Sequence, residues 1–197
     1  MGKIIVIGSQ KGGVGKTTTT LNLAYSLREM GKKVLTVDFD SQANLTTCYG
    51  IEDTGALEYS IGHLMMAQIE EELPENLEDY IQSREGVDYI PSSIYLSVVD
   101  AKLRTEMGAE RMLAEVLEPL KSRYDYILID TCPSLGMLPL HWQSYLPGVL
   151  PHTDEMDGHG TAVYSSPVPS EHLLALLLFP YRPSANLLHH QILFSLN

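Results

Sequence analysis

Cysteine is scarce in this sequence, and long hydrophobic runs are missing. The 197 residues include two cysteines, Cys48 and Cys132, which lie far apart and outside any metal-ligand spacing. Their scarcity is typical of a protein in a reducing compartment, without a disulfide framework. The two cysteines also do not supply a ligand pair for an iron–sulfur cluster. No apolar stretch reaches the roughly 18 residues of a membrane-spanning helix, and the apolar N-terminus is too short for a signal peptide. We therefore expect a cytoplasmic protein with no membrane association.

Basic residues are also few. Lysine and arginine number 13 against 25 aspartates and glutamates, so the formal net charge is −12. Such a chain repels nucleic acid and anionic lipid unless its basic residues gather in one patch, and the sequence contains no such patch. Hydrophobic residues make up 44% of the chain and charged residues 19%, which is typical of a globular protein. The length is enough for one domain with its own hydrophobic core.

Short apolar runs alternate with helical patterns over the first 130 residues. Four runs predict buried strands, at residues 3–8, 32–38, 87–93 and 124–130. Helices are predicted between them, at residues 17–30, 55–73 and 96–123, the last with a break at 107–108. Strands that alternate with helices predict a mostly parallel sheet with helices on both faces, which is a three-layer α/β/α fold.

A glycine-rich loop follows the first strand and leads directly into the first helix. It extends from Lys11 to Thr18 and reads KGGVGKTT. Backbone N–H groups and the helix dipole attract phosphates in such a loop, Lys16 adds a point charge, and the hydroxyl of Thr17 can bind Mg²⁺. The usual phosphate-loop pattern has a glycine where this sequence has Gln10, and a second lysine follows it. A turn that binds no anion is the alternative, and the Lys-Thr-Thr sequence disfavours it.

Three aspartates stand at or just after predicted strand ends. Asp38 ends the second strand, Asp40 lies two residues beyond it, and Asp130 ends the last strand. Carboxylates near a phosphate loop are placed to hold Mg²⁺ or to orient an attacking water. Turn formation or helix capping is the alternative role for each of them.

These segments together resemble the ParA/MinD family of ATPases, which have a deviant Walker A P-loop. The resemblance rests on the loop, on VDFDSQAN after the second strand and on ILIDTCPSLG at the last one, and it covers residues 1 to about 138. IPSSIYLSVVDAKL also looks like a ParA-type segment, so the ParA/Soj branch of partition ATPases is favoured over MinD. The resemblance implies an AAA-type P-loop NTPase fold with ATP and Mg²⁺ as cofactors.

The resemblance also assigns roles to individual residues. Nucleotide contacts are implied for Lys11, Gly12, Gly13, Val14, Gly15, Lys16, Thr17 and Thr18. Thr17 would bind Mg²⁺ directly and Asp130 would hold it through a water. Asp40 would orient the attacking water, Lys16 would bind the phosphates of its own nucleotide, and Lys11 would reach the nucleotide of a partner subunit. Lys11, Lys16 and Asp40 are therefore the implied catalytic residues.

Members of this family segregate plasmids or chromosomes. Their ATP-bound homodimers bind DNA non-specifically, and a ParB-type partner stimulates hydrolysis and release. The resemblance therefore implies an ATPase that dimerises on binding ATP and acts with such a partner. The family's DNA-binding half has no recognisable counterpart in this sequence.

The character of the chain changes after about Leu138. The last 59 residues hold one basic residue, seven of the eleven prolines and six of the seven histidines. They continue neither the strand–helix alternation nor the family's sequence. We divide the chain into a ParA-like core at residues 1–138 and a non-family tail at 139–197, expected to be poorly ordered or the product of a reading-frame change. The fold is accordingly expected to be incomplete at its C-terminus.

Two functions follow from this division. The first is a ParA-type partition ATPase that binds and hydrolyses ATP. The second is a truncated remnant, whose turnover is lost through the altered C-terminal half and which serves as an interaction module for nucleotide or for intact relatives.

Overall fold

The computed structural model describes residues 2–8, 12–106, 109–132 and 162–165 of the chain. Lys11, the break predicted at 107–108 and nearly all of the predicted tail lie outside these residues. Among the described residues, no helix combines the length and the apolar character needed to cross a bilayer.

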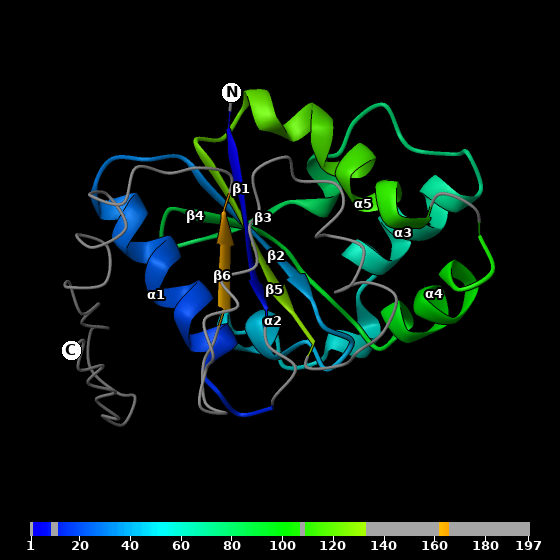
Figure 1. Cartoon of the computed structure of the whole chain (residues 1–197), viewed down its shortest axis with the longest axis horizontal. Coiled ribbons are helices and arrows are strands. Elements are labelled where there is room, and N and C mark those ends of the chain that lie inside the picture. Colours follow the sequence, from blue (N-terminus) through cyan, green and yellow to red (C-terminus); the bar gives the residue numbers. More distant parts are fainter. Residues whose placement is uncertain (1, 9–11, 107–108, 133–161, 166–197) are drawn as a thin grey trace.

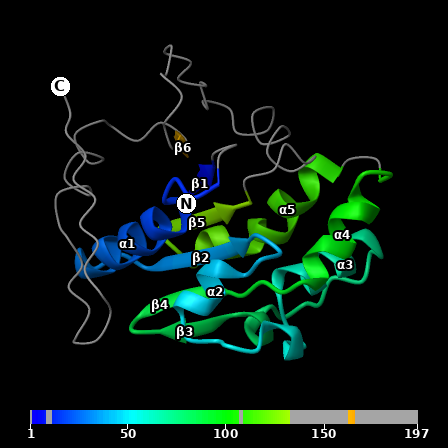
Figure 2. The same ribbon diagram turned by 90° about the horizontal axis from the view of Figure 1, so that it is seen from below.

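A twisted sheet forms the middle layer (Figure 1). Its strands are β1 (Lys3–Gly8), β2 (Val34–Phe39), β3 (Gln82–Arg84), β4 (Val87–Ile90), β5 (Tyr126–Thr131) and β6 (Ala162–Ser165). Their order across the sheet is β3-β4-β2-β5-β1-β6. The four inner strands are parallel, whereas β3 and β6 pair antiparallel at the two edges (Figure 2). All six residues of β2 are buried, as expected for a strand covered on both faces.

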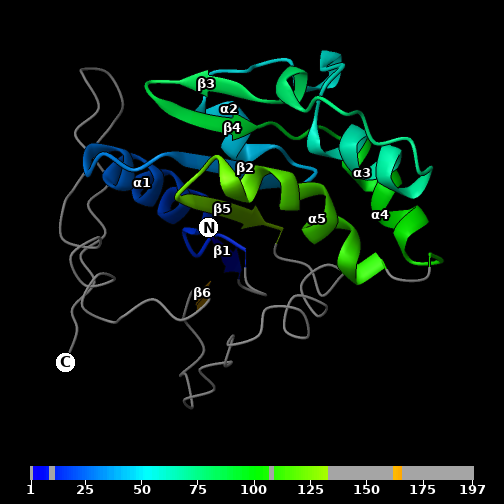
Figure 3. The same ribbon diagram turned by 90° about the horizontal axis from the view of Figure 1, so that it is seen from above.

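Helices cover both faces of the sheet and complete the predicted three-layer fold. They are α1 (Lys16–Glu29), α2 (Asn44–Cys48), α3 (Ile61–Ile69), α4 (Tyr95–Leu103) and α5 (Ala109–Leu117), with short 3₁₀ turns η1 (Thr54–Ala56), η2 (Glu78–Tyr80) and η3 (Glu118–Ser122). Figure 3 shows α1 on one side of the sheet and α3, α4 and α5 on the other. Two separate groups of buried residues correspond to these layers: Ala24, Leu27 and Leu45 pack with one, and Leu64 and Leu113 with the other.

The main elements match the sequence predictions, with two corrections to the helices. The helix predicted at 55–73 is shorter, because Ser60 is extended and the chain reaches a left-handed conformation at Glu71 (φ 57°). The helix predicted at 96–123 is instead α4, α5 and η3, the last with a proline at its start. Proline lacks the N–H that would continue an α-helical hydrogen-bond ladder.

Two edge strands were not predicted from the sequence. β3 is three residues long and only half buried at best, so it lacks an apolar signal. It is joined to β4 by a turn at Glu85 and Gly86, both with positive φ, a conformation typical of tight hairpins. β6 lies within the predicted tail and pairs with β1, so that part of the tail covers a sheet edge.

Candidate functional site

The glycine loop presents its backbone to open space at the end of β1. Gly13 (φ 71°) and Gly15 (φ 86°) adopt left-handed conformations that other residues rarely tolerate. A Cβ atom added at Gly12, Gly13 or Gly15 would meet no atom of the described residues within 4 Å, apart from those of its chain neighbours. The glycines are therefore needed for the backbone conformation and leave room for a ligand next to the loop.

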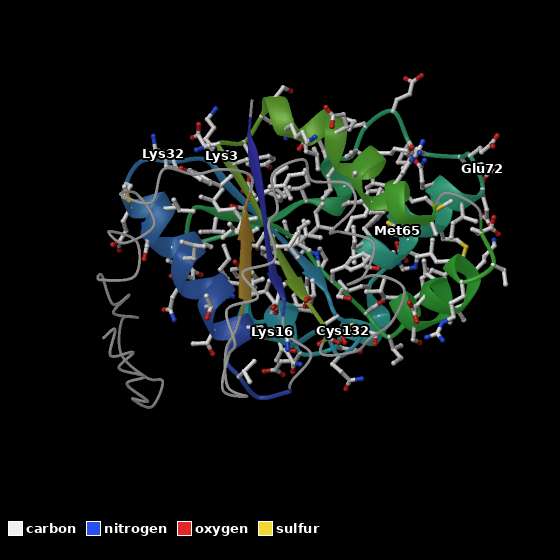
Figure 4. All side chains as sticks on the ribbon, in the orientation of Figure 1. Lys3, Lys16, Lys32, Met65, Glu72 and Cys132 are labelled. Carbon is white, nitrogen blue, oxygen red and sulfur yellow. The ribbon has the colours of Figure 1, made fainter. Side chains whose placement is uncertain are left out.

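Helix α1 begins at the end of this loop with Lys16. No acidic residue lies in its first turn, and no side chain caps it. The unpaired N–H groups and the helix dipole make such a terminus a site for anions. The side chain of Lys16 is only 7% exposed, and Figure 4 places it at the same edge of the molecule as Cys132, which follows β5. Thr18 is exposed beside it.

A hydroxyl and a carboxylate meet where α1 and β5 approach each other. Thr17 Oγ1 donates a hydrogen bond of 2.7 Å to Asp130 Oδ2. Thr20 Oγ1, one turn along α1, lies 3.4 Å from Asp130 Oδ1 and 3.1 Å from the carbonyl oxygen of Lys16. Asp130 is 1% exposed, so these two hydroxyls fix the orientation of a buried carboxylate.

These oxygen atoms fit a magnesium site that a nucleotide would complete. Mg²⁺ prefers oxygen ligands and is commonly held by one or two protein groups, water and substrate phosphates. Among the described residues, no group of three or more His, Cys, Asp or Glu side chains could hold a metal alone. Thr17 and Asp130 are the residues that could supply the protein's share of such a site.

Two more carboxylates lie at the end of β2: Asp38 within the strand and Asp40 directly after it. Asp40 is buried, and its Oδ1 accepts the Gln42 backbone N–H at 2.9 Å. Asp38 Oδ1 accepts the N–H of Asp40 at 3.3 Å, and its Oδ2 accepts both the N–H (2.8 Å) and the hydroxyl (2.6 Å) of Thr46. Asp38 thus holds together the end of β2, the Asp40 segment and α2.

The hydroxyl of Thr46 continues this network to the loop between β4 and α4. Its Oγ1 accepts the backbone N–H of Ser92 at 2.8 Å. Asp38, Thr46 and Ser92 are all buried, so this chain of hydrogen bonds joins three segments of the protein in its interior.

Burial changes the ionisation of the acidic residues. It raises the pKa of Asp38 to about 7, although the hydrogen bonds from Thr46 oppose the shift. It raises the pKa of Asp130 to about 6, where the hydrogen bond from Thr17 and the charge of Lys16 lower the pKa and Asp40 raises it further. Carboxyl groups whose pKa values are shifted towards neutrality are common at functional sites.

The structure gathers most of the predicted site residues at the carboxyl ends of β1, β2 and β5. Lys16, Thr17, Asp40 and Asp130 are placed there. Lys11 lies outside the described residues. The sequence prediction did not include Thr20 or Thr46. Thr20 could have been identified because it is one helical turn beyond Lys16, whereas nothing in the sequence connects Thr46 with Ser92.

A glycine-rich loop joins the parallel strand β1 to α1, and a carboxylate lies at the end of the neighbouring strand β5. This arrangement defines a P-loop nucleoside triphosphatase fold. Comparison with known proteins agrees with this class. The sequence profile of the AAA domain matches residues 2–142. The chain belongs to this family and, within it, to the ParA-type P-loop ATPases.

Among curated relatives, the sporulation initiation inhibitor protein Soj of Bacillus subtilis is 41% identical over 143 residues, which cover 72% of this chain and 54% of Soj. The chromosome partitioning protein ParA of Myxococcus xanthus is 38% identical over 144 residues, covering 72% of this chain and 48% of ParA. The chain thus spans about half the length of these relatives.

Solved structures show the same likeness. Cobyrinic acid a,c-diamide synthase from Mycobacterium smegmatis, solved with an ATP analogue and magnesium, has a TM-score of 0.64 and 31% identity. The match covers 72% of this chain and 55% of the synthase. A plasmid partition protein of Borrelia burgdorferi bound to AMPPNP has a TM-score of 0.55 and 32% identity, covering 69% of this chain and 55% of that protein.

Proposed function

We propose that this protein binds ATP with Mg²⁺ and hydrolyses it, as a partition ATPase of the ParA type. The observation that carries the proposal is the 2.7 Å hydrogen bond between Thr17 and Asp130 at the start of α1, beside a glycine loop with open space before it. Residues 1–138 form the nucleotide-binding unit in this proposal, and 139–197 form a segment unlike the family's.

Each residue of the site has a definite task in this proposal. The loop N–H groups and Lys16 bind the phosphates, and Asp40 positions the attacking water. Magnesium held by Thr17 and Asp130 neutralises charge that develops on the phosphate oxygens. Phosphoryl transfer depends chiefly on such positioning and charge stabilisation. These groups therefore provide the kinds of interaction that ATP hydrolysis requires.

We further propose that ATP brings two copies together. Lys11 then reaches the nucleotide of the partner subunit, as an arginine finger does in other ATPases, and would contribute about 10³- to 10⁵-fold to the rate. The dimer would act in the cytoplasm, in plasmid or chromosome segregation, with a ParB-type partner and with DNA. The partition proteins among its relatives support this proposal.

A second candidate is a remnant that binds nucleotide without turnover. It is favoured by one observation: the match to the AAA domain ends at residue 142, although the chain continues to residue 197. Such a protein could still join intact relatives through its P-loop face.

Nucleotide binding and turnover separate the two candidates. The full chain is titrated with a fluorescent ATP analogue in Mg²⁺, and phosphate release is measured with ATP. We expect binding and turnover in the wild type, loss of both in Lys16→Ala, and loss of turnover alone in Lys11→Ala. Lys32→Ala is a matched control, since Lys32 is exposed and lies at the opposite end of the molecule from Lys16 (Figure 4).

Sedimentation with and without ATP tests dimerisation in the same samples. Binding without turnover would establish the remnant instead of the ATPase. A wild-type chain that binds no nucleotide at all would rule out both candidates.

A further inference from the structure

The backbone of Asp40 is tied to the central sheet by a hydrogen bond. Asp40 lies directly after β2, and its N–H donates to Oδ1 of Asp38, a residue of β2, at 3.3 Å. In the turn that follows, Asp40 Oδ1 accepts the N–H of Gln42 and the carbonyl oxygen of Asp40 accepts the N–H of Ala43, each at 2.9 Å. These last two bonds set the shape of the turn, whereas the bond to Asp38 places the turn relative to the sheet.

The carboxyl group of Asp38 is held by both its backbone and a neighbouring side chain. Its backbone belongs to a central strand, because β2 pairs with β4 on one side and with β5 on the other. Its Oδ2 accepts two hydrogen bonds from Thr46, one from the backbone N–H at 2.8 Å and one from the hydroxyl at 2.6 Å. The hydroxyl bond is the shorter of the two. Thr46 therefore sets the orientation of the carboxyl group to which Asp40 is bonded.

The hydroxyl of Thr46 is itself oriented by a third segment. Its Oγ1 accepts the backbone N–H of Ser92 at 2.8 Å. A hydroxyl has one hydrogen, so with a lone pair directed at Ser92 this hydrogen is directed at Asp38. Figures 2 and 3 show α2, which carries Thr46, beside β2 and β4. Thr46 therefore links the end of β2 with the loop that follows β4.

The loop that carries Ser92 is a firm support for this link. Its residues 91–93 are all buried. The carbonyl oxygen of Pro91 accepts the N–H of Ile61, the first residue of α3, at 2.8 Å. The carbonyl oxygen of Ser93 accepts the N–H of Leu96 in α4 at 3.0 Å. The hydrogen bonds that begin at Asp40 therefore end on a loop that two helices hold in place.

Burial makes the position of Asp40 sensitive to the Thr46 hydroxyl. Asp38 is 1% exposed, and Thr46 and Ser92 are 0% exposed, so water does not replace a hydrogen bond lost there. Without the hydroxyl, Asp38 loses one donor and the Ser92 N–H loses its acceptor. The carboxyl group can then turn, and the bond that places Asp40 weakens. A displacement of about 1 Å in a catalytic site can cost about 100-fold in rate.

We propose that Thr46 is a positioning residue for ATP hydrolysis, which holds Asp40 in place through Asp38. Thr46 takes no part in the chemistry itself. The inference rests on the proposed function, in which Asp40 orients the attacking water. It assigns to Thr46 an effect on turnover and none on nucleotide binding, because the hydrogen bonds that connect it to Asp40 include no residue of the glycine loop or of α1. A residue that only stabilised the fold would not separate the two.

Phosphate release and nucleotide affinity, measured on the full chain, test the proposal. Thr46→Val keeps the shape of the side chain and removes the hydroxyl. Its turnover at saturating ATP should fall about 10- to 100-fold, while its affinity for a fluorescent ATP analogue in Mg²⁺ stays as in the wild type. Thr46→Ser keeps the hydroxyl and should recover most of the turnover. Circular dichroism verifies that each variant is folded, and Thr46→Cys, whose thiol is only a weak donor, replaces a valine variant that does not fold.

Thr36→Val is the matched control. Thr36 is another threonine with 0% exposure, two residues before Asp38 in β2, and its hydroxyl donates to the Tyr49 hydroxyl at the end of α2 at 3.0 Å. Its substitution removes a buried hydrogen bond to α2 without changing the bonds of Asp38. We expect lower stability but wild-type turnover. An equal loss of turnover in Thr36→Val and Thr46→Val would show that loosening of α2 is the cause, and would overturn the proposal.

Hydrogen exchange without ATP measures the Asp40 segment directly. Thr46→Val should speed exchange of the amides in residues 40–43, and Thr36→Val should leave it as in the wild type. Unchanged exchange there, wild-type turnover in Thr46→Val, a joint loss of binding and turnover, or no recovery in Thr46→Ser would each overturn the proposal. A wild type that binds ATP without hydrolysing it ends the proposed function alone, because exchange in residues 40–43 still decides whether Thr46 holds this segment.

Discussion

Asp38 and Asp130 occupy paired positions on the neighbouring strands β2 and β5. Each carboxylic side chain is 1% exposed, and burial raises the pKa of each, to about 7 for Asp38 and about 6 for Asp130. The protein therefore holds two acidic groups side by side in its interior, at the carboxyl ends of β2 and β5, near the start of α1. A cation bound beside them would favour the ionised form of both carboxyl groups.

This pair predicts that the protein without ligands becomes less stable as the pH rises from about 4 to 7. The folded-state pKa values lie above the ordinary value of 3.8, so in this window the native state binds more protons than the unfolded state. The free energy of unfolding then decreases with pH, by about 1.4 kcal/mol for each unit of raised pKa. Urea unfolding at pH 5 and at pH 7 measures the difference.

Asp38→Asn provides the control for this pH dependence. The amide can still accept hydrogen bonds but does not titrate in this range, so the variant should lose part of the slope between pH 4 and 7. Mg²⁺ with ATP should stabilise the wild type most at pH 7, because ligand binding adds to the free energy of unfolding. A slope that is the same in wild type and variant would show that Asp38 does not titrate in this window.

Thr46 is predicted to be a structural centre of the site although it has no place in the chemistry. Thr46→Val keeps the shape of the side chain but removes the donor to Asp38 and the acceptor for the Ser92 N–H, both buried. Unpaired buried polar groups should lower the free energy of unfolding by about 2 to 3 kcal/mol. Thr46→Ser retains the hydroxyl and should lose much less. Equal losses in the two variants would show that the methyl group, which serine lacks, contributes as much to stability as the hydroxyl does.

The sequence was sufficient to predict the parallel sheet and the first helix. The inner strands are apolar on both faces, and α1 follows the glycine loop and ends before Gly31, whose positive φ stops it. The meeting of Thr17 and Asp130 could also be expected, because the carboxyl ends of parallel strands lie at one edge. They are 113 residues apart in the sequence, and the pairing of β1 with β5 brings them together.

Other features depend on contacts that no local pattern encodes. The Thr46 hydroxyl meets Ser92 only because β2 and β4 are neighbours in the sheet. His63 is half-buried against Tyr95 because α3 and α4 pack at a glycine. The polar strand β3 has no apolar signal of its own and exists through its pairing with β4. Tertiary packing decides all three.

Gly62 is predicted to be required for the contact between α3 and α4. Alanine is normally better than glycine inside a helix by about 1 kcal/mol. At Gly62, however, the new methyl group would lie 3.1 Å from Leu96 N and 3.3 Å from Leu96 Cα, which are backbone atoms that cannot rotate away. Gly62→Ala should therefore lower the free energy of unfolding by about 1 to 2 kcal/mol, as overpacking does. Gly55→Ala is a control, since its methyl group would meet only Asp53 Oδ1 at 3.5 Å.

Ala43 is predicted to be a site of stored backbone strain in the segment that follows Asp40. It adopts a left-handed conformation (φ 53°, ψ 36°) at the start of α2, held there by its N–H bond to the carbonyl oxygen of Asp40 and by the Thr47 N–H bonded to its own carbonyl oxygen. This conformation costs an L-residue about 1 to 2 kcal/mol, whereas glycine adopts it freely.

Ala43→Gly should accordingly stabilise the protein, although the gain is reduced because glycine loses more chain entropy on folding. The net increase in the free energy of unfolding should be about 0.5 to 1 kcal/mol in urea titrations. Ala101→Gly, at an exposed position within α4, is the matched control and should destabilise by a similar amount, since its backbone is helical. If both changes destabilise the protein equally, the left-handed conformation at Ala43 carries no strain. If only Ala43→Gly stabilises it, the segment that bears Asp40 is held in place against the preference of its own sequence by the hydrogen bonds at Asp38 and Asp40.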